Sequence, residues 1–444
     1  MLTSRTPRLR TAALAVCASA GLVAACGDKP KAGEGPFADL VAEVVPKIER
    51  EMGLPFKTPP KLETRSRDEV AVFVRKQLES ERGKQQVAGQ EAVYKLLGLI
   101  PDTMNLGGLL QRLLEEQIVG YYDPATKVLY VVDGAPEALL NQTVSHELVH
   151  ALQDQYIRVD SIQAQTDDGD RQVAAQSVLE GQAVFMQLRI DANAGPMLKM
   201  PGGWDRIRDM IRDGSVGMPV FASAPRAVRE GLLFPYLGGA DFVRRFINAR
   251  PEKELLTDLP VSTKQILNDS AYFSGSAATR DLPTKVTLPA PKTGTVFYSN
   301  TFGEFETRLA LVQYLRNDEL ARRAAIGVDG DRYAVIKLPQ GNALVWASVW
   351  DSPVDAADFL DAMGDAARRR YELGKQDVPA GSTTRRYDAP ATPKRTARTV
   401  TISLEQVGGK PVVIYMDLPA GASAPIDPAR ITIDSPAAGN ASGR

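Results

Sequence analysis

The sequence predicts an α+β protein of two domains, a mostly helical first domain with a short β hairpin and a smaller α+β second domain. Three observations support this. Apolar residues recur with helical spacing through most of residues 37–273. Two β-rich runs within residues 118–132 flank a turn-forming stretch. Strand and helix patterns then alternate after residue 294, and 444 residues suffice for two separate cores.

Composition bounds the class of protein. Hydrophobic residues make up 44% of the chain and the formal net charge is −1, which is ordinary for a globular protein. There is no excess of lysine and arginine and no basic run, so nucleic acid is excluded as an expected partner.

The first 25 residues have the pattern of an export signal. Three arginines form a basic head, and the apolar run of residues 11–25 is too short to span a bilayer. The run ends in VAACG, which resembles the lipobox of bacterial lipoproteins. That resemblance implies a lipoprotein signal peptide at 1–25 and a lipid on Cys26, whereas ordinary cleavage near Ala25 is the alternative.

Removal of the signal changes the rest of the chain in two ways. It takes away three arginines, so the net charge moves from −1 to −4. It also removes Cys17, so Cys26 is the remaining cysteine and no disulfide is expected. Residues 26–36 form an expected tether, and the only expected membrane attachment is the N-terminal lipid.

The first domain is expected at 37–273, and its elements follow from periodicity and turn residues. Pro136 suits the start of the helix that carries both histidines of the chain. Residues 195–232 mix glycine, proline and short helical pieces. The expected helices are 37–53, 67–98, 106–116, 136–156, 171–192, the stretch after Pro235 to 249, and 262–269, with the hairpin at 118–132 turning at 123–126.

A stretch rich in Ser, Thr, Pro and Ala at 274–294 is the expected linker. The second domain, of unknown role, is expected at 295–418, and residues 419–444 are expected to be a disordered tail. Within the domain the patterns predict helices at 302–325 and 353–372 and strands at 332–337, 343–350, 399–406 and 411–418.

The stretch SHELVHALQD at 145–154 holds the only two histidines of the chain, His146 and His150. Residues four apart on a helix project from one face, so both imidazoles can bind one metal ion. Glu147 lies beside them, where it can reach a water on that ion. This is the arrangement of the HExxH motif, with two ligands and a general base. The alternative is a histidine pair without metal.

A catalytic zinc ion needs a third protein ligand, which must be a carboxylate because no other histidine or usable cysteine exists. Glu180 is favoured because it lies in the apolar helical stretch SVLEGQAVFM, where an unpaired carboxylate is costly to bury. Gly181 and Ala183 would let that helix approach a neighbour closely. The alternative for Glu180 is a solvent-facing side chain. The other candidates are Asp154, Asp160, Asp167, Asp168 and Asp170.

These motifs resemble the gluzincin, or thermolysin-like, metallopeptidases, in which a helical glutamate follows HExxH by some 30 residues. Residues 60–275 closely resemble peptidase-MA-like bacterial lipoproteins through QIVGYYDPATKVLYVV, VSHELVHALQDQY, LEGQA and FPYLGGADFV. GEFETRLAL, GDRYAVI and SVWDSPVDAADFLDA resemble their second domain. The resemblance implies one Zn²⁺ per chain held by His146, His150 and Glu180, with Glu147 as base.

Two further roles are expected from the resemblance. Tyr236, in FPYLGG, is the candidate donor to the oxyanion, and a structural buried tyrosine is the alternative. The hairpin would pair with extended substrate, so that Gly120, Tyr121 and Tyr122 line the cleft, or it is structural only. The pattern departs from the family at Val184, where thermolysin-like enzymes often carry an aspartate that bonds a metal histidine.

The expected function is therefore a zinc-dependent peptidase that cleaves peptide or protein substrates. It would be exported and lipid-anchored to the bacterial cell membrane or outer membrane, facing the periplasm or the exterior. One alternative is a zinc hydrolase of cell-wall amides. The other is a non-catalytic envelope lipoprotein that binds zinc for stability.

Overall fold

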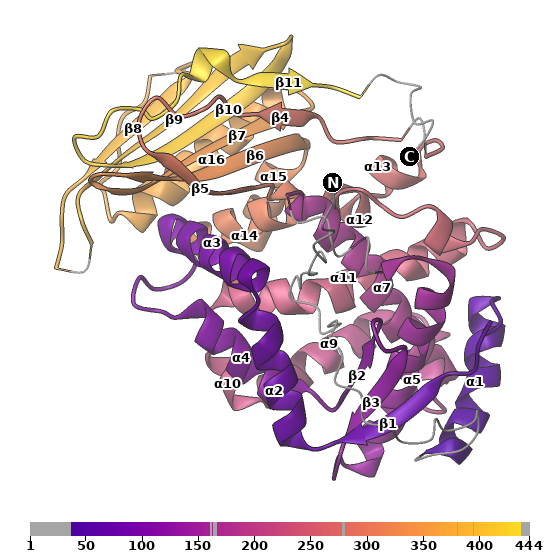
Figure 1. The fold of residues 1–444 in the computed structure, drawn as a ribbon. Helices are drawn as coiled ribbons and strands as arrows, with labels where there is room; N and C mark the ends of the chain where they lie inside the picture. Colours follow the sequence, from indigo (N-terminus) through magenta and orange to yellow (C-terminus); the bar gives the residue numbers. More distant parts are fainter. Residues whose placement is uncertain are drawn as a thin grey trace, which may run out of the picture.

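The computed structural model describes residues 37–159, 162, 167–277, 280–379, 381–393 and 395–436. The expected signal peptide, the tether and Cys26 lie outside these residues. The fold is α+β, as predicted, with helices gathered in the first part of the chain and a six-stranded antiparallel sheet in the second (Figure 1). No helix in the described ranges has both the length and the apolarity to cross a membrane.

The first part is built mainly of helices. Ser80 divides the predicted helix at 67–98, because its side chain accepts from the Gly83 N–H at 3.1 Å and so caps a second helix. The helices are α1 (Ala38–Met52), α2 (Arg67–Leu78), α3 (Glu81–Leu97), α4 (Leu106–Gln117), α5 (Glu137–Tyr156), α7 (Gly169–Ile190), α8 (Ala194–Leu198), α9 (Gly203–Val216), α10 (Pro219–Ser223), α11 (Arg226–Ala249), α12 (Thr263–Leu267) and α13 (Asp269–Phe273), with a 3₁₀ turn at Leu255–Thr257.

Helix α11 corrects the prediction that a helix starts only after Pro235. It begins at Arg226 and continues through the proline. A proline removes one backbone hydrogen bond but does not prevent helical dihedrals on either side. The extensive packing of α11 on α7 holds both halves in one helix.

A three-stranded sheet lies beside α5. The strands are β1 (Lys61–Arg65), β2 (Gly120–Asp123) and β3 (Val128–Val132), in the order β1-β3-β2. The predicted hairpin is confirmed, and the Asp123 carboxylate accepts from the Ala125 N–H at 2.9 Å to stabilise its turn. Strand β1, which sequence analysis missed, pairs in parallel with β3. Strand β2 is therefore at one edge of the sheet.

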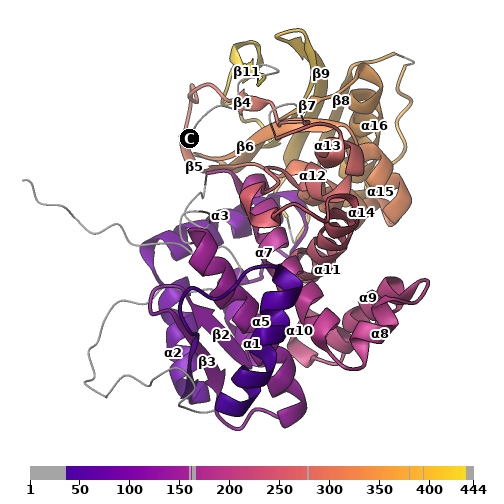
Figure 2. The same ribbon diagram turned by 90° about the vertical axis from the view of Figure 1, so that its right-hand side faces the viewer.

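The second part is an antiparallel sheet covered on both faces. Its strand order is β5-β6-β7-β10-β9-β8. Three helices pack on one face, and a two-stranded ribbon covers part of the other (Figures 1 and 2). The strands are β5 (Thr295–Asn300), β6 (Val328–Leu338), β7 (Gly341–Trp350), β8 (Thr384–Ala389), β9 (Arg398–Val407) and β10 (Lys410–Pro419), the helices are α14 (Gly303–Leu315), α15 (Asp318–Ala325) and α16 (Pro353–Arg370), and the ribbon pairs β4 (Lys285–Thr287) with β11 (Thr432–Asp434).

Two expectations for this part are wrong. Arg316, at φ 53°, ends α14 and splits the helix predicted at 302–325. The tail expected to be disordered is ordered through residue 436, because Ile426 and Ile431 are buried against the sheet and β11 pairs with β4. These isolated isoleucines lie between prolines and show no helix or strand periodicity. Strand β4 also lies inside the predicted linker.

The two parts meet at the N-terminus of α7. The Gly169 N–H donates to Asn300 Oδ1 at 2.7 Å, and the Asp170 N–H donates to Thr301 Oγ1 at 3.0 Å. Two of the unpaired N–H groups at the start of α7 are thus satisfied by the second part of the chain. The Phe234 and Phe305 rings stack across the same junction, with centroids 3.8 Å apart.

Candidate metal centre

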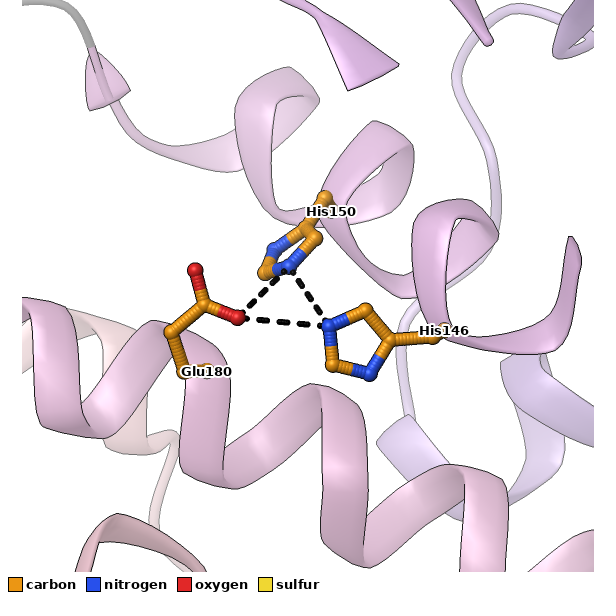
Figure 3. Close-up of side chains that lie close together, drawn as sticks. All are labelled: His146, His150 and Glu180. Atoms are coloured by element: carbon orange, nitrogen blue, oxygen red, sulfur yellow. Dashed lines mark hydrogen bonds and ion pairs between the residues drawn. The ribbon is translucent and has the colours of Figure 1, made fainter. Parts of the chain in front are cut away.

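His146, His150 and Glu180 meet at one point between α5 and α7 (Figure 3). The two Nε2 atoms are 3.2 Å apart. Glu180 Oε2 lies 3.2 Å from His146 Nε2 and 3.3 Å from His150 Nε2. The three side chains singled out by sequence analysis thus form a nearly equilateral triangle of donor atoms.

The size of this triangle fits a zinc ion. Tetrahedral zinc with bonds of about 2.0–2.1 Å holds its ligand atoms roughly 3.3–3.4 Å apart. Hydrogen bonds alone explain the triangle poorly, because three lone-pair-bearing atoms facing one another repel unless protons or a cation lie between them. Two imidazoles with one carboxylate are also the ligand types of catalytic zinc.

Two helices position the ligands. His146 and His150 are one turn apart on α5, on the side that packs against α7. Glu180 lies in the middle of α7, which also packs closely on α11. A Cβ on Gly181 would come within 2.1 Å of the Gly239 carbonyl carbon, so only glycine permits this contact. The close helix approach predicted from Gly181 is confirmed.

Gln153, which sequence analysis missed, fixes the orientation of His150. Its Oε1 accepts from His150 Nδ1 at 2.9 Å, while its Nε2 donates to Leu179 O at 3.1 Å and Gln182 Oε1 at 3.0 Å. The Leu179 carbonyl sets the orientation of the amide, so Nδ1 of His150 carries the hydrogen and Nε2 presents its lone pair to the metal position. The sequence offered one signal for this role: on a helix, a polar residue three positions after His150 lies on the same face and can reach its ring.

The electrostatics of the metal-free site favour a cation. Burial opposes a charged His150, but the Glu180 carboxylate outweighs it and raises the pKa of His150 to about 9. Burial also opposes ionisation of Glu180, yet the neighbouring histidines hold the pKa of Glu180 well below its usual range. In the absence of metal a proton therefore takes the place of the ion, and metal binding must displace it.

Glu147 lies next to the triangle without belonging to it. Its carboxylate is buried and accepts from the Tyr122 N–H at 2.8 Å through Oε2. Burial raises the pKa of Glu147, and the charges of His150 and His146 oppose that rise. Strand β2 therefore holds the carboxylate in place through its outward-facing backbone. A buried carboxylate with a raised pKa is a stronger base than an exposed one.

The remaining predicted residues lie around this centre. The Tyr236 ring, from α11, stacks on His146 with centroids 6.0 Å apart and an interplanar angle of 24°. Gly120 permits α5 to approach, since a Cβ there would come within 2.8 Å of the Thr143 methyl. The Tyr121 side chain is buried on the face of the small sheet that points away from the metal centre, where its ring stacks on Phe73 with centroids 4.5 Å apart. Tyr121 therefore offers the centre only backbone atoms.

The other carboxylates considered as ligands have different partners. Asp154 accepts from the Tyr122 hydroxyl at 2.8 Å and from Lys127. Asp168 caps α7, and Asp170 accepts from the Thr263 N–H at 2.8 Å. Asp167 is outside the triangle as well, and Asp160 lies outside the described residues.

A second group of carboxylates, Asp281, Asp329 and Asp351, lies in the C-terminal half. Lys264 pairs with Asp281 and Asp351, both at 2.7 Å, and Lys410 pairs with Asp329. These ammonium groups already compensate the negative charge, so this group does not require a metal ion.

Comparison with known proteins is informative only for the second part of the chain. Residues 294–414 match a protein family described as a domain of unknown function (DUF8575). No curated protein and no solved structure matches the chain. The matched segment begins within the predicted linker and contains strands β5 to β9 and the first half of β10, whereas His146, His150 and Glu180 lie outside it.

Proposed function

We propose that the chain is a zinc-dependent peptidase of the gluzincin type, with Zn²⁺ held by His146, His150 and Glu180. The proposal depends chiefly on the open triangle of donor atoms. Structural zinc sites use four protein ligands, whereas catalytic sites use three and leave a position for water. Among the described residues, no fourth histidine, cysteine or carboxylate joins the triangle.

Zinc bound here would lower the pKa of a coordinated water to about 7 and polarise the substrate carbonyl. Glu147 accepts the proton of the attacking water and delivers it to the leaving amine. The Tyr236 hydroxyl donates to the oxygen on which negative charge develops. Gln153 keeps His150 in the tautomer that presents Nε2 to the metal position.

The edge of the small sheet suits an extended substrate. Strand β2 has a partner on one side only in the described sheet, namely β3. Its outer edge lies beside Glu147, whose carboxylate accepts a hydrogen bond from the Tyr122 N–H. A peptide that pairs with the remaining backbone groups near Gly120 would run past the general base.

We also propose export and attachment by a lipid on Cys26, which rests on the lipobox-like sequence alone. The enzyme would then act in the bacterial envelope, at the cell membrane or outer membrane. Incorporation of a radiolabelled fatty acid into the chain tests this, with Cys26→Ser as the variant that should lose the label.

The central experiment combines zinc content with hydrolysis, using purified chain without residues 1–26. Wild type should hold about one zinc per chain. Glu147→Gln should keep the zinc and lose about 10²–10⁴-fold in rate on a peptide pool. Glu180→Gln should lose the zinc, whereas Asp154→Asn, on the same helix as the histidines, should keep it.

Two other outcomes would point to the alternatives. Cleavage of a muropeptide pool but not of the peptide pool would replace the peptidase with a hydrolase of cell-wall amides. Stoichiometric zinc without hydrolysis of either pool would indicate a structural metal. A zinc content near zero in wild type would contradict every form of the proposal.

A further inference from the structure

A cavity of about 180 Å³ lies between the helical part and the C-terminal sheet, and none of the proposed metal ligands lines it. Its walls are mostly apolar and come from α2, α3, α4, α7 and α11. The second part of the chain closes it with residues of β5, β6 and α14. A dry cavity of roughly 150 Å³ holds a benzene-sized molecule, so this one has room for a small apolar group.

Two helices of the cavity wall, α7 and α11, also carry residues of the metal centre. Gln172, Val173 and Gln176 line it from α7, and Glu180 is one turn beyond Gln176 on the same face. Leu232 and Pro235 line it from α11, with Tyr236 next in the chain. One helical turn is about 5.4 Å, so the part of the cavity wall at Gln176 lies about one turn from Glu180 along α7.

Two acceptors in the cavity wall could take a further donor, and one of them has no hydrogen bond at all. Glu306 of α14 accepts from the Tyr94 hydroxyl at 2.8 Å, and no lysine, arginine or histidine in the described ranges pairs with its carboxylate. The side-chain oxygen of Gln86, Oε1, is buried and makes no hydrogen bond. Buried acceptors without donors are costly. A ligand that brings hydrogen-bond donors and positive charge would suit these two acceptors, which line the same cavity.

Burial among these apolar walls raises the pKa of Glu306 to about 7, although the bond from Tyr94 opposes the rise. Asp331 adds to the rise by repulsion, and the nearby tyrosines Tyr94, Tyr298 and Tyr333 bring no positive charge. Among the residues that the structure describes, the ionised form of the Glu306 carboxyl therefore has no paired cation. An ammonium group would supply it.

We propose that this cavity binds a primary ammonium group carried on an apolar stem, with the ammonium at Glu306 and Gln86 and the stem against the helices. The lysine side chain of a peptide and a free aliphatic or aryl amine share this chemistry. The second part of the chain would then supply the charged end of a binding site whose apolar walls come from the first part.

Direct binding tests this without relying on peptidase activity. Calorimetric titration of the metal-free full-length chain would use 2-phenylethylamine, the neutral 2-phenylethanol and the anionic 3-phenylpropionate. The amine should bind about tenfold or more tighter than the alcohol, and the anion weakest. Glu306→Gln should reduce amine binding to the level of the alcohol. Equal binding of amine and alcohol, or no binding of either, would overturn the proposal.

A steric variant locates the bound molecule. Gly231 lines the cavity and nothing lies within 4 Å of its Cβ position, so we expect the larger side chain of Gly231→Leu to occupy part of the cavity. It should abolish binding of the amine. Gly214→Leu, on α9 and likewise without close neighbours, should leave binding unchanged. Amine binding that survives Gly231→Leu would place the ligand elsewhere and contradict the assignment.

Two capped pentapeptides, identical except that one carries lysine and the other norleucine at the same position, distinguish the source of the ammonium group. Tighter binding of the lysine peptide, lost in Glu306→Gln, would identify a peptide side chain as the ligand. If neither peptide binds while the amine does, the ligand is a free amine. Because these readouts are binding constants, they stand or fall separately from hydrolysis by the proposed zinc centre.

Discussion

Replacement of Gln153 by alanine should weaken zinc binding although Gln153 does not touch the metal position. The variant removes three hydrogen bonds, from His150 Nδ1 and to Leu179 O and Gln182 Oε1. Loss of the partner that orients a metal histidine costs about 10–100-fold in affinity, or roughly 1.4–2.7 kcal/mol. The three lost bonds, together with the space that the shorter side chain leaves in the core, should also lower the free energy of unfolding by about 3–5 kcal/mol.

The zinc dissociation constant is measured by competition with a chromophoric chelator, and stability by urea unfolding of the metal-free protein. Gln265→Ala is the matched control, because Gln265 is also fully buried and bonds Val261 N and Asp281 O away from the site. It should lose similar stability and keep wild-type zinc affinity. If both variants change zinc affinity equally, or neither does, the orienting role of Gln153 is refuted.

Three further outcomes are expected. Zinc must displace a proton from His150 below pH about 9, so its apparent affinity in buffered titrations should rise with pH up to that value. The raised pKa of His150 also means that its ion pair with Glu180 stabilises the metal-free protein fully below pH 6.5, the ordinary pKa of histidine in an unfolded chain. This stabilisation is lost as the pH rises toward 9. Melting temperatures of the metal-free protein measured across that range would detect the loss. Gly181→Ala should destabilise the protein by about 3 kcal/mol or prevent folding, because its Cβ would meet the Gly239 backbone, whereas Gly214→Ala should be neutral or slightly stabilising in urea unfolding. An affinity independent of pH, or equal effects of the two alanines, would contradict these expectations.

Much of the fold was predictable because its signals are local. The hairpin showed β-rich runs around a turn, and the helix carrying the histidines began after Pro136 as expected. The errors fall where non-local packing decides. Strand β1 is formed by pairing with β3, and the ordered tail through residue 436 is held by two isoleucines against a distant sheet.

The candidate site divides in the same way. His146, Glu147 and His150 share one helical turn, so helical geometry alone relates them. Gln153 was within reach of the same reasoning, but its role became clear only from its bonds to α7. The bond from the Tyr122 N–H to Glu147 joins residues 25 apart in the chain, and no periodicity indicates it.

By itself, the sequence determined the composition of the site, since the chain has two histidines and few carboxylates in apolar surroundings. Only the tertiary structure decided that Glu180, and none of the described loop aspartates, completes the triangle, because close packing of α7 on α11 and α5 fixes where that carboxylate points. The tertiary structure alone also forms the cavity lined by α3, α11 and α14. Its walls come from segments more than 200 residues apart, which local patterns do not relate.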